Sequence, residues 1–260
     1  MRADKFFADK FGSRTKSAEA IEKGLVLVNG KTVRAKDEIK DTDDITFVQA
    51  EETFVSNGGY KLNRALLAWN FNCKDKIFAD IGASTGGFTD CLLQRNAKKI
   101  YTVDVGESLL APSLLKSGKI VQMENTNARY LEKTDFADEL DGVVVDVSFI
   151  SLKWIFPTVK KILKENGDAF LLIKPQFECE KKNIGKSGIV HTSAHGEIVK
   201  KVVRYALDCG LYPMAIINAP VKKGKNIEYV IHCKPTYENA RSVEQIVSDV
   251  QTFLKNRETT

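Results

Sequence analysis

Six short apolar runs alternate with helical patterns between residues 77 and 232, and this alternation constrains the fold more than any other feature of the chain. The helical patterns lie around residues 87–95, 153–164 and 195–208. Strands that alternate with helices form a mostly parallel, doubly wound sheet, so we predict an α/β domain. The predicted strands are Ile77–Ile81, Ile100–Val105, Gly142–Val147, Ala169–Lys174, Tyr212–Asn218 and Ile227–His232.

The first predicted strand leads into a loop of small residues, Asp80–Asp90. A strand, a turn rich in Gly and Ser and then a helix are typical of a nucleotide-type ligand loop, because glycine lets the backbone approach a ligand closely. Ser84 stands where the dinucleotide fingerprint has a glycine, and an acid flanks the loop at each end. Because these acids oppose an anion, the loop favours a sulfonium and an amino group over a pyrophosphate.

Four charged side chains fall near the carboxyl ends of predicted strands, namely Asp80, Asp104, Asp146 and Lys174. Ligands of doubly wound sheets bind beyond these ends, so we expect the four side chains to converge on one crevice. Asp104 follows Gly82 by 22 residues, which is a spacing at which a carboxylate can bind ribose hydroxyls. A nicotinamide cofactor would satisfy the same geometry.

The chain before the large domain has the pattern of a small α+β module over residues 1–48. Helical patterns at 4–11 and 16–23 precede an Asn-Gly hairpin at 24–33 and a closing strand at 44–48. We place an acidic linker at 49–56, the large domain at 57–240 and a C-terminal helix or tail at 241–260. Residues 1–36 carry nine Lys and Arg against four Asp and Glu, which favours a polyanion partner, although a solvated helix face has the same composition.

Composition excludes several classes of protein. The apolar run Ala169–Ile173 is too short to span a bilayer and no apolar signal segment follows Met1, so we expect a cytoplasmic protein without a membrane partner. The five cysteines are an odd number without Cys-x-x-Cys spacing, which indicates reduced thiols and no metal site. We expect a monomer and leave a dimer open.

The N-terminal module resembles the RNA-binding domain typified by ribosomal protein S-four. The resemblance is carried by Arg2-Ala3-Asp4, by Arg14 with Lys16, and by the hairpin Val26–Lys31. It implies RNA binding mainly through phosphate contacts, and a purely structural module is the alternative. The RNA-binding residues we expect are Arg2, Arg14, Lys16, Lys23 and Lys31, together with Lys182 in a basic loop of the large domain.

The large domain resembles the TlyA-type ribosomal RNA methyltransferases of the wider FtsJ-like group, some of which carry a hemolysin label. Four motifs carry this resemblance: Asp80–Asp90, Val103–Gly106, Val144–Leu152 and Ile173–Glu178. The resemblance runs from about residue 2 to residue 233. It implies a Rossmann-like domain that uses S-adenosylmethionine to methylate a ribose 2′-hydroxyl of ribosomal RNA, alone or within ribosomal subunits.

The same resemblance implies a catalytic set of Lys61, Asp146, Lys174 and Glu228. Lys61 stands at the N-terminus of a predicted helix. A ribose hydroxyl is a weak nucleophile, so a lysine acting as general base, held by carboxylates, suits the reaction. We expect Lys174 to be this base, with Asp146 and Glu228 orienting it and Lys61 contacting the substrate or transition state. The implied cofactor contacts are Asp80, Gly82, Ser84, Gly86, Gly87, Phe88, Thr89, Asp104, Val105, Asn127 and Ala128.

Other functions remain possible on the sequence alone. A base-amine methyltransferase is disfavoured because Asp146-Val147-Ser148-Phe149 lacks a Pro-Pro-aromatic run. An NAD oxidoreductase would need a tighter glycine pattern than this loop has. A non-catalytic RNA-binding protein and a membrane-active hemolysin are the remaining alternatives.

Overall fold

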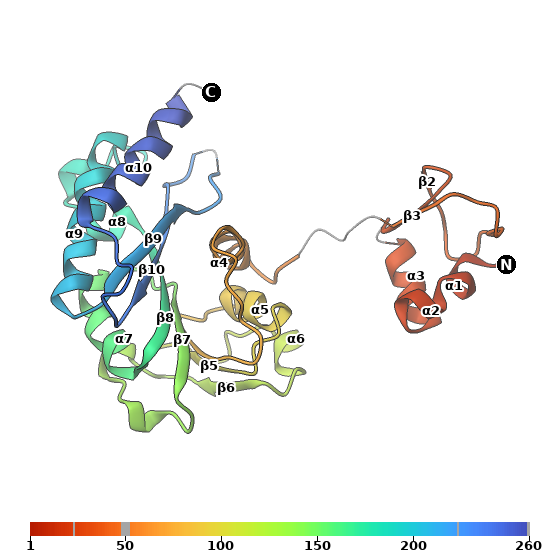
Figure 1. The fold of residues 1–260 in the computed structure, drawn as a ribbon, viewed down its shortest axis with the longest axis horizontal. Coiled ribbons are helices and arrows are strands. Elements are labelled where there is room, and N and C mark those ends of the chain that lie inside the picture. The colour runs from red at the N-terminus through yellow and green to blue at the C-terminus, as the bar shows by residue number, and fades with distance from the viewer. Residues whose placement is uncertain (23, 48–52, 223, 259–260) are drawn as a thin grey trace. The chain divides into compact units, whose positions relative to one another are not determined.

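A computed structural model describes residues 1–22, 24–47, 53–222 and 224–258 of the chain (Figure 1). The chain divides into two compact units, Met1–Thr53 and Phe54–Thr260. Lys23, residues 49–52 of the predicted linker and the last residue of the predicted strand at 44–48 lie outside the described residues.

The first unit packs three short helices against a three-stranded sheet. The helices are α1 (Ala3–Phe6), α2 (Ala8–Phe11) and α3 (Arg14–Glu22), so the predicted helix at 4–11 is in fact two helices. The strands lie in the order β2 (Lys31–Thr32), β1 (Val26–Val28) and β3 (Ile45–Phe47), with both pairs antiparallel. The predicted hairpin is confirmed, because Asn29 and Gly30 turn the chain with positive φ angles of 53° and 74°.

The second unit is built on a seven-stranded sheet in the order β6-β5-β4-β7-β8-β10-β9. β10 runs antiparallel to β8 and to β9, and the other pairs in the sheet are parallel. The predicted doubly wound α/β class and all six predicted strands are confirmed, although β8 begins earlier than predicted. The strands are β4 (Ile77–Ile81), β5 (Lys99–Val103), β6 (Ile120–Met123), β7 (Leu140–Val145), β8 (Leu163–Ile173), β9 (Tyr212–Asn218) and β10 (Tyr229–Lys234).

β6 is the strand that the sequence pattern did not predict. It lies at the edge of the sheet, and its two central residues, Val121 and Gln122, are exposed. An edge strand with one apolar and one polar residue exposed at its centre has no continuous apolar run to mark it.

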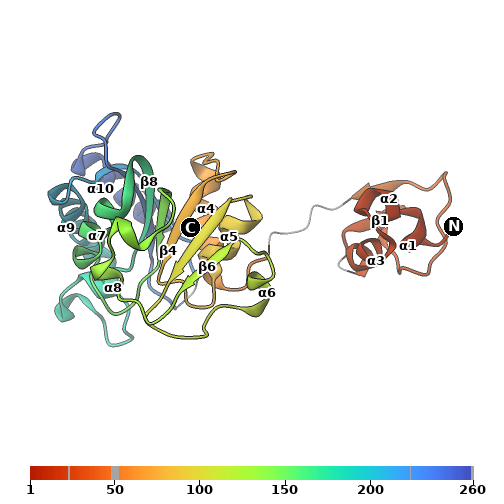
Figure 2. The same ribbon diagram turned by 90° about the horizontal axis from the view of Figure 1, so that it is seen from below.

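Helices cover both faces of this sheet. Successive residues of β8 point to opposite faces, so that Leu171 belongs to one core cluster and Phe170 and Leu172 to another. Figures 1 and 2 show α4 and α5 on one side and α7, α9 and α10 on the other. The helices are α4 (Asn57–Ala68), α5 (Gly87–Gln94), α6 (Pro112–Leu115), α7 (Phe156–Ile162), α8 (Pro175–Glu178), α9 (His195–Asp208) and α10 (Val243–Glu258).

The direction of β10 decides where its first residues lie. Tyr229 of β10 pairs with Ile173 at the end of β8. Because the two strands are antiparallel, Glu228 before β10 and Lys174 after β8 lie at the same edge of the sheet. A parallel strand would have placed Glu228 at the opposite edge.

Candidate active site

Two cavities lie at the carboxyl edge of the parallel strands. The first, which we call the Asp104 cavity, has a volume of about 640 Å³ and is lined by the segments that follow β4, β5, β6 and β7. The second, which we call the Lys61 cavity, has a volume of about 680 Å³ and is lined by residues of α4 and α8 and of the loop before β10. Of the four side chains expected to share one crevice, Asp104 and Asp146 line the first cavity, and Lys174 pairs with Asp146. Lys61 and Glu228, which were not part of that expectation, line the second cavity.

Asp104 organises the wall of the first cavity. Its Oδ2 accepts a hydrogen bond from the Ser84 backbone N–H at 2.8 Å, and its Oδ1 accepts one from the Gly106 N–H at 2.9 Å. The carboxylate therefore joins the loop after β4 to the loop after β5. Six of the predicted cofactor residues line this cavity, namely Gly82, Ser84, Asp104, Val105, Asn127 and Ala128.

Gly82 is required by a close approach between two chain segments. Its φ is +80°, and a Cβ at this position would lie 2.7 Å from the carbonyl oxygen of Asp146. A larger residue would push apart the segments that follow β4 and β7, both of which line the cavity. The glycine is thus needed for contact within the protein and not only for contact with a ligand.

The other five predicted cofactor residues, Asp80, Gly86, Gly87, Phe88 and Thr89, do not line the Asp104 cavity. A Cβ on Gly86 would meet Leu110 and Leu114, and one on Gly87 would meet Ser56 and the first residues of α4. These two glycines therefore allow neighbouring elements to pack against the loop. The structure gives them a supporting position behind the cavity wall.

Asp80 is a fully buried carboxylate beneath the loop. Its Oδ2 accepts a hydrogen bond from Thr89 Oγ1 at 2.6 Å, and its Oδ1 has no hydrogen-bond partner among the described residues. The pKa of Asp80 is raised to about 7, mainly by burial and also by the negative charges of Asp146 and Asp104, against the lowering effect of the hydrogen bond from Thr89. The three acids thus repel one another electrostatically, and a positive ligand would relieve this repulsion.

The four predicted catalytic residues form two lysine–carboxylate pairs. Lys174 Nζ lies 2.6 Å from Asp146 Oδ1 and donates a hydrogen bond to Ser148 Oγ at 2.8 Å. Lys61 Nζ lies 2.6 Å from Glu228 Oε2. The prediction that Glu228 orients Lys174 is therefore corrected, because the structure pairs Glu228 with Lys61. The reason is that α4 presents Lys61 toward the segment that precedes β10.

The predicted position of Lys61 at a helix N-terminus is also corrected. α4 begins at Asn57, so Lys61 lies in its second turn. Gly58 and Gly59 are poor helix formers, but the side chain of Phe54 fills the space that a Cβ on Gly59 would need. Tertiary packing therefore extends the helix through the two glycines.

Three side chains beside the catalytic pairs were not assigned a role from the sequence. Ser148 accepts from Lys174, and Gln176 Nε2 donates to Glu228 Oε1 at 3.4 Å. Phe149 lines the Asp104 cavity with 90% of its surface exposed and a φ of +63°. All three follow a strand end within a few residues, which is the signal that would have suggested them.

Those predicted RNA-binding residues of the first unit that the structure describes lie on its surface. Arg2 and Arg14 both pair with the buried Asp4, at 3.1 and 2.9 Å, and their side chains stay about half exposed. Lys16 and Lys31 are exposed. In the second unit, the exposed Lys182 pairs with Glu180 at 2.9 Å.

Neither a metal site nor a membrane span is found in the described part of the chain. No group of three or more His, Cys, Asp or Glu residues there could hold a metal ion. None of the helices described is long and apolar enough to cross a bilayer.

Comparison with protein families decides between the classes of function that the sequence alone left open. Residues 54–235 match the FtsJ-like methyltransferase family, and residues 1–45 match the S4 domain. The chain belongs to the FtsJ-like methyltransferase family. The two lysine–carboxylate pairs and the Asp104 cavity both lie within the residues that match this family.

Relatives of this FtsJ-like methyltransferase extend over most of its length. It is 42% identical over 224 residues to hemolysin A of Brachyspira hyodysenteriae, covering 85% of this chain and 93% of that protein. It is 35% identical over 246 residues to the 16S/23S rRNA (cytidine-2′-O)-methyltransferase TlyA of Mycobacterium tuberculosis, covering 93% and 92% of the two chains. A solved structure of a hemolysin-labelled protein from Streptococcus thermophilus is similar with a TM-score of 0.71 and 34% identity, covering 100% and 98%.

Proposed function

We propose that this protein uses S-adenosylmethionine to methylate a ribose 2′-hydroxyl of ribosomal RNA. The observation that carries the proposal is the pair of Lys174 and Asp146 at 2.6 Å, in which Asp146 also lines the Asp104 cavity. The ion-pair partner of the proposed base Lys174 thus also lines the cavity proposed for the cofactor. The TlyA relative is named as an rRNA 2′-O-methyltransferase, and the S4 match of the first unit supports an RNA partner. The word hemolysin in the names of other relatives is a label only.

The Asp104 cavity fits a cationic, nucleoside-bearing cofactor. Its volume of about 640 Å³ lies within the range of small-ligand sites. Asp104 would accept hydrogen bonds from ribose hydroxyls, and Asn127 and Ala128 would contact the adenine. The carboxylates of Asp104 and Asp146 in the cavity wall favour the positive end of the ligand over an anion. When bound, S-adenosylmethionine supplies a methyl group made electrophilic by its sulfonium.

Lys174 has the arrangement that a general base needs. A neutral amine has two N–H groups and one lone pair. Ser148 Oγ accepts one N–H of Lys174 at 2.8 Å, and Asp146 Oδ1 lies 2.6 Å from Nζ as its ion-pair partner, so the two residues hold Nζ in place. In the proposed reaction the lone pair of Lys174 would accept the proton of the ribose 2′-hydroxyl, whose oxygen is the acceptor of the methyl group.

In this proposal the Lys61–Glu228 pair positions the substrate RNA. Lys61, held by Glu228, contacts the ribose or the phosphate next to it. Arg2, Arg14, Lys16 and Lys31 of the first unit contact RNA phosphates, which supplies affinity with little sequence readout.

Replacing Lys174 with alanine tests the proposal. We expect Lys174→Ala to lower kcat for methyl transfer to ribosomal subunits by at least about 100-fold, because the variant has no base to remove the hydroxyl proton. Binding of S-adenosylmethionine, measured by calorimetry, should change little. The measurement is incorporation of labelled methyl groups into ribosomal RNA.

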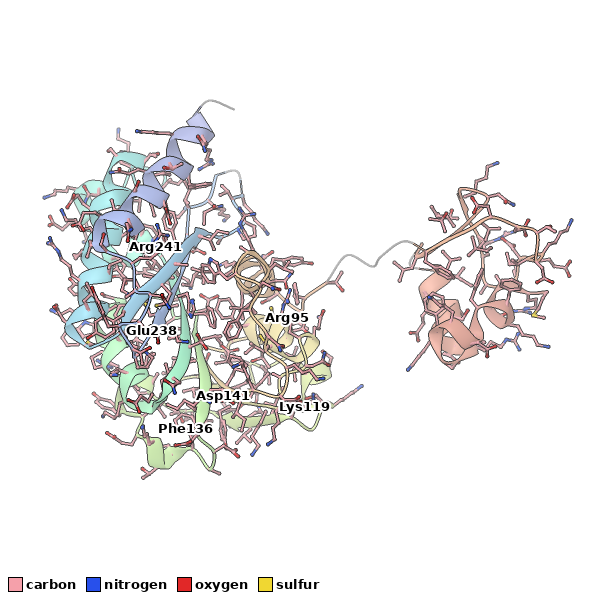
Figure 3. All side chains as sticks on the ribbon, in the orientation of Figure 1. Arg95, Lys119, Phe136, Asp141, Glu238 and Arg241 are labelled. Carbon is pink, nitrogen blue, oxygen red and sulfur yellow. The ribbon has the colours of Figure 1, made fainter. Side chains whose placement is uncertain are left out.

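Lys164→Ala is a matched control. Lys164 pairs with Asp141, which lies near the amino-terminal end of β7, away from the carboxyl edge (Figure 3). This variant also removes a lysine–aspartate pair, and we expect it to retain wild-type kcat. Similar kcat values for the two variants would contradict the role of Lys174.

A further inference from the structure

The Lys61 cavity has a lining that the proposed reaction does not use. Asn57, Tyr60, Gln176, Lys222 and Lys225 contribute to it beside the Lys61–Glu228 pair. It has no lining residue in common with the Asp104 cavity. A ligand could therefore occupy it while the cofactor is bound.

The charges of this cavity favour an anion. Lys61 is neutralised by Glu228 at 2.6 Å. Lys222 Nζ donates to the amide oxygen of Asn57 at 2.6 Å, and that partner is uncharged. Lys225 has no ion pair within the described residues. Two positive charges are thus left without a carboxylate, and a bound anion would reduce their repulsion.

Gln176 adds a polar group that lacks a partner. Its Nε2 donates to Glu228 Oε1 at 3.4 Å, while its Oε1 is buried and has no hydrogen-bond partner among the described residues. A buried acceptor in this state costs free energy unless a ligand supplies a donor. A ribose hydroxyl or a base amino group is such a donor.

We propose that the Lys61 cavity binds a nucleotide of the substrate RNA that neighbours the methylated one. Lys222 and Lys225 contact its phosphodiester, and the Gln176 amide contacts a hydroxyl or amino group. This inference rests on the proposed function, in which Lys174 meets the target ribose. Gln176, two residues after Lys174, lines the Lys61 cavity and donates to Glu228, so the cavity adjoins the proposed base. Lysines without a carboxylate partner can bind the phosphate of a nucleotide, and a buried acceptor can bind one of its N–H or O–H groups. The same lysines would repel a metal cation.

The test is RNA binding by the full chain with Lys222→Ala and Lys225→Ala combined. The probe is full-length unmodified ribosomal RNA, and the readout is the equilibrium Kd over a series of salt concentrations. We expect Kd to rise about tenfold and the slope of log Kd against log salt to fall by roughly 0.7 for each phosphate that the variant no longer neutralises. The affinity for S-adenosylmethionine should stay at the wild-type value.

The control variant combines Lys74→Ala with Lys98→Ala. Both lysines are exposed and precede β4 and β5, at the opposite edge of the sheet, so net charge changes equally. If the two double variants give the same Kd and salt slope, the inference is overturned. It is also overturned if the Lys222 and Lys225 variant weakens cofactor binding as much as RNA binding.

The binding readout separates this inference from the proposed function. Absence of methyl transfer by the wild-type protein would refute the proposed function. The difference in Kd between the two double variants does not depend on methyl transfer, so it still tests the nucleotide site.

Discussion

The Asp104 cavity and the Lys61 cavity have similar volumes, about 640 and 680 Å³, but opposite chemistry. The first has two acids, Asp104 and Asp146, and one basic residue, Arg129, in its wall, and Asp80 is buried behind the loop that lines it. The second has three lysines and one glutamate. One cavity therefore suits a positive ligand and the other suits an anion. Lys174 pairs with a residue of the first cavity and is followed by Gln176 of the second, so it lies between the two.

This difference suggests how a methyl donor and an RNA are kept in separate places. The acids that favour a sulfonium would repel a phosphate, and the lysines that favour a phosphate would repel a sulfonium. In the proposed function, each ligand is thus disfavoured in the cavity of the other. A variant that alters one cavity should leave binding in the other unchanged.

Among the substitutions that test whether the two cavities bind independently, Asp104→Asn should have the largest effect on ligand affinity. The neutral amide cannot form the charge-assisted hydrogen bonds to the cofactor ribose, which are worth about 1.5 to 3 kcal/mol. We expect the Kd for S-adenosylmethionine to rise about 10- to 100-fold. The Kd for ribosomal RNA, measured on the same preparation, should not change. An equal decrease of both affinities would show that the two cavities are not independent.

Asp80→Asn should have a smaller effect. It should change how the free energy of unfolding depends on pH. Because the folded-state pKa of Asp80 is raised from 3.8 to about 7, the folded protein holds a proton that the unfolded chain releases within this window. The contribution of Asp80 to the free energy of unfolding therefore decreases as pH rises from 4 to 7, by up to about 1.4 kcal/mol per pH unit. Below pH 4 it is fully present.

Urea unfolding of both proteins at pH 5 and pH 7 measures this contribution. We expect the stability of the wild-type protein to decrease more between the two pH values than that of the Asp80→Asn variant. The difference between the two proteins isolates Asp80 from the other titrating groups. A larger decrease in the variant would contradict the raised pKa.

Much of the fold and part of the site could be predicted from the sequence. Asp104, Asp146 and Lys174 each follow a strong apolar strand, and parallel strands bring such positions to one edge. The sheet class and this convergence followed directly from the alternation of strands and helices. Weakly patterned β6, at the edge of the sheet, was missed for lack of an apolar run.

The rest of the site depends on contacts that a linear pattern does not contain. The alternation of elements does not give the antiparallel direction of β10, which brings Glu228 to the site and pairs it with Lys61. The loop glycines were interpreted as ligand contacts, whereas Gly87 is needed for packing against the start of α4. The role of Gln176 follows from its buried oxygen without a partner, which only the folded chain reveals.

The position of the transferred methyl group tests the central claim most directly. Ribosomal subunits lacking the modification would be incubated with the protein and labelled S-adenosylmethionine, and their RNA digested to nucleosides for mass spectrometry. The account predicts label in a 2′-O-methylated nucleoside, with none after incubation with the Lys174→Ala variant. Label on a base, or no label on any ribose, would contradict it.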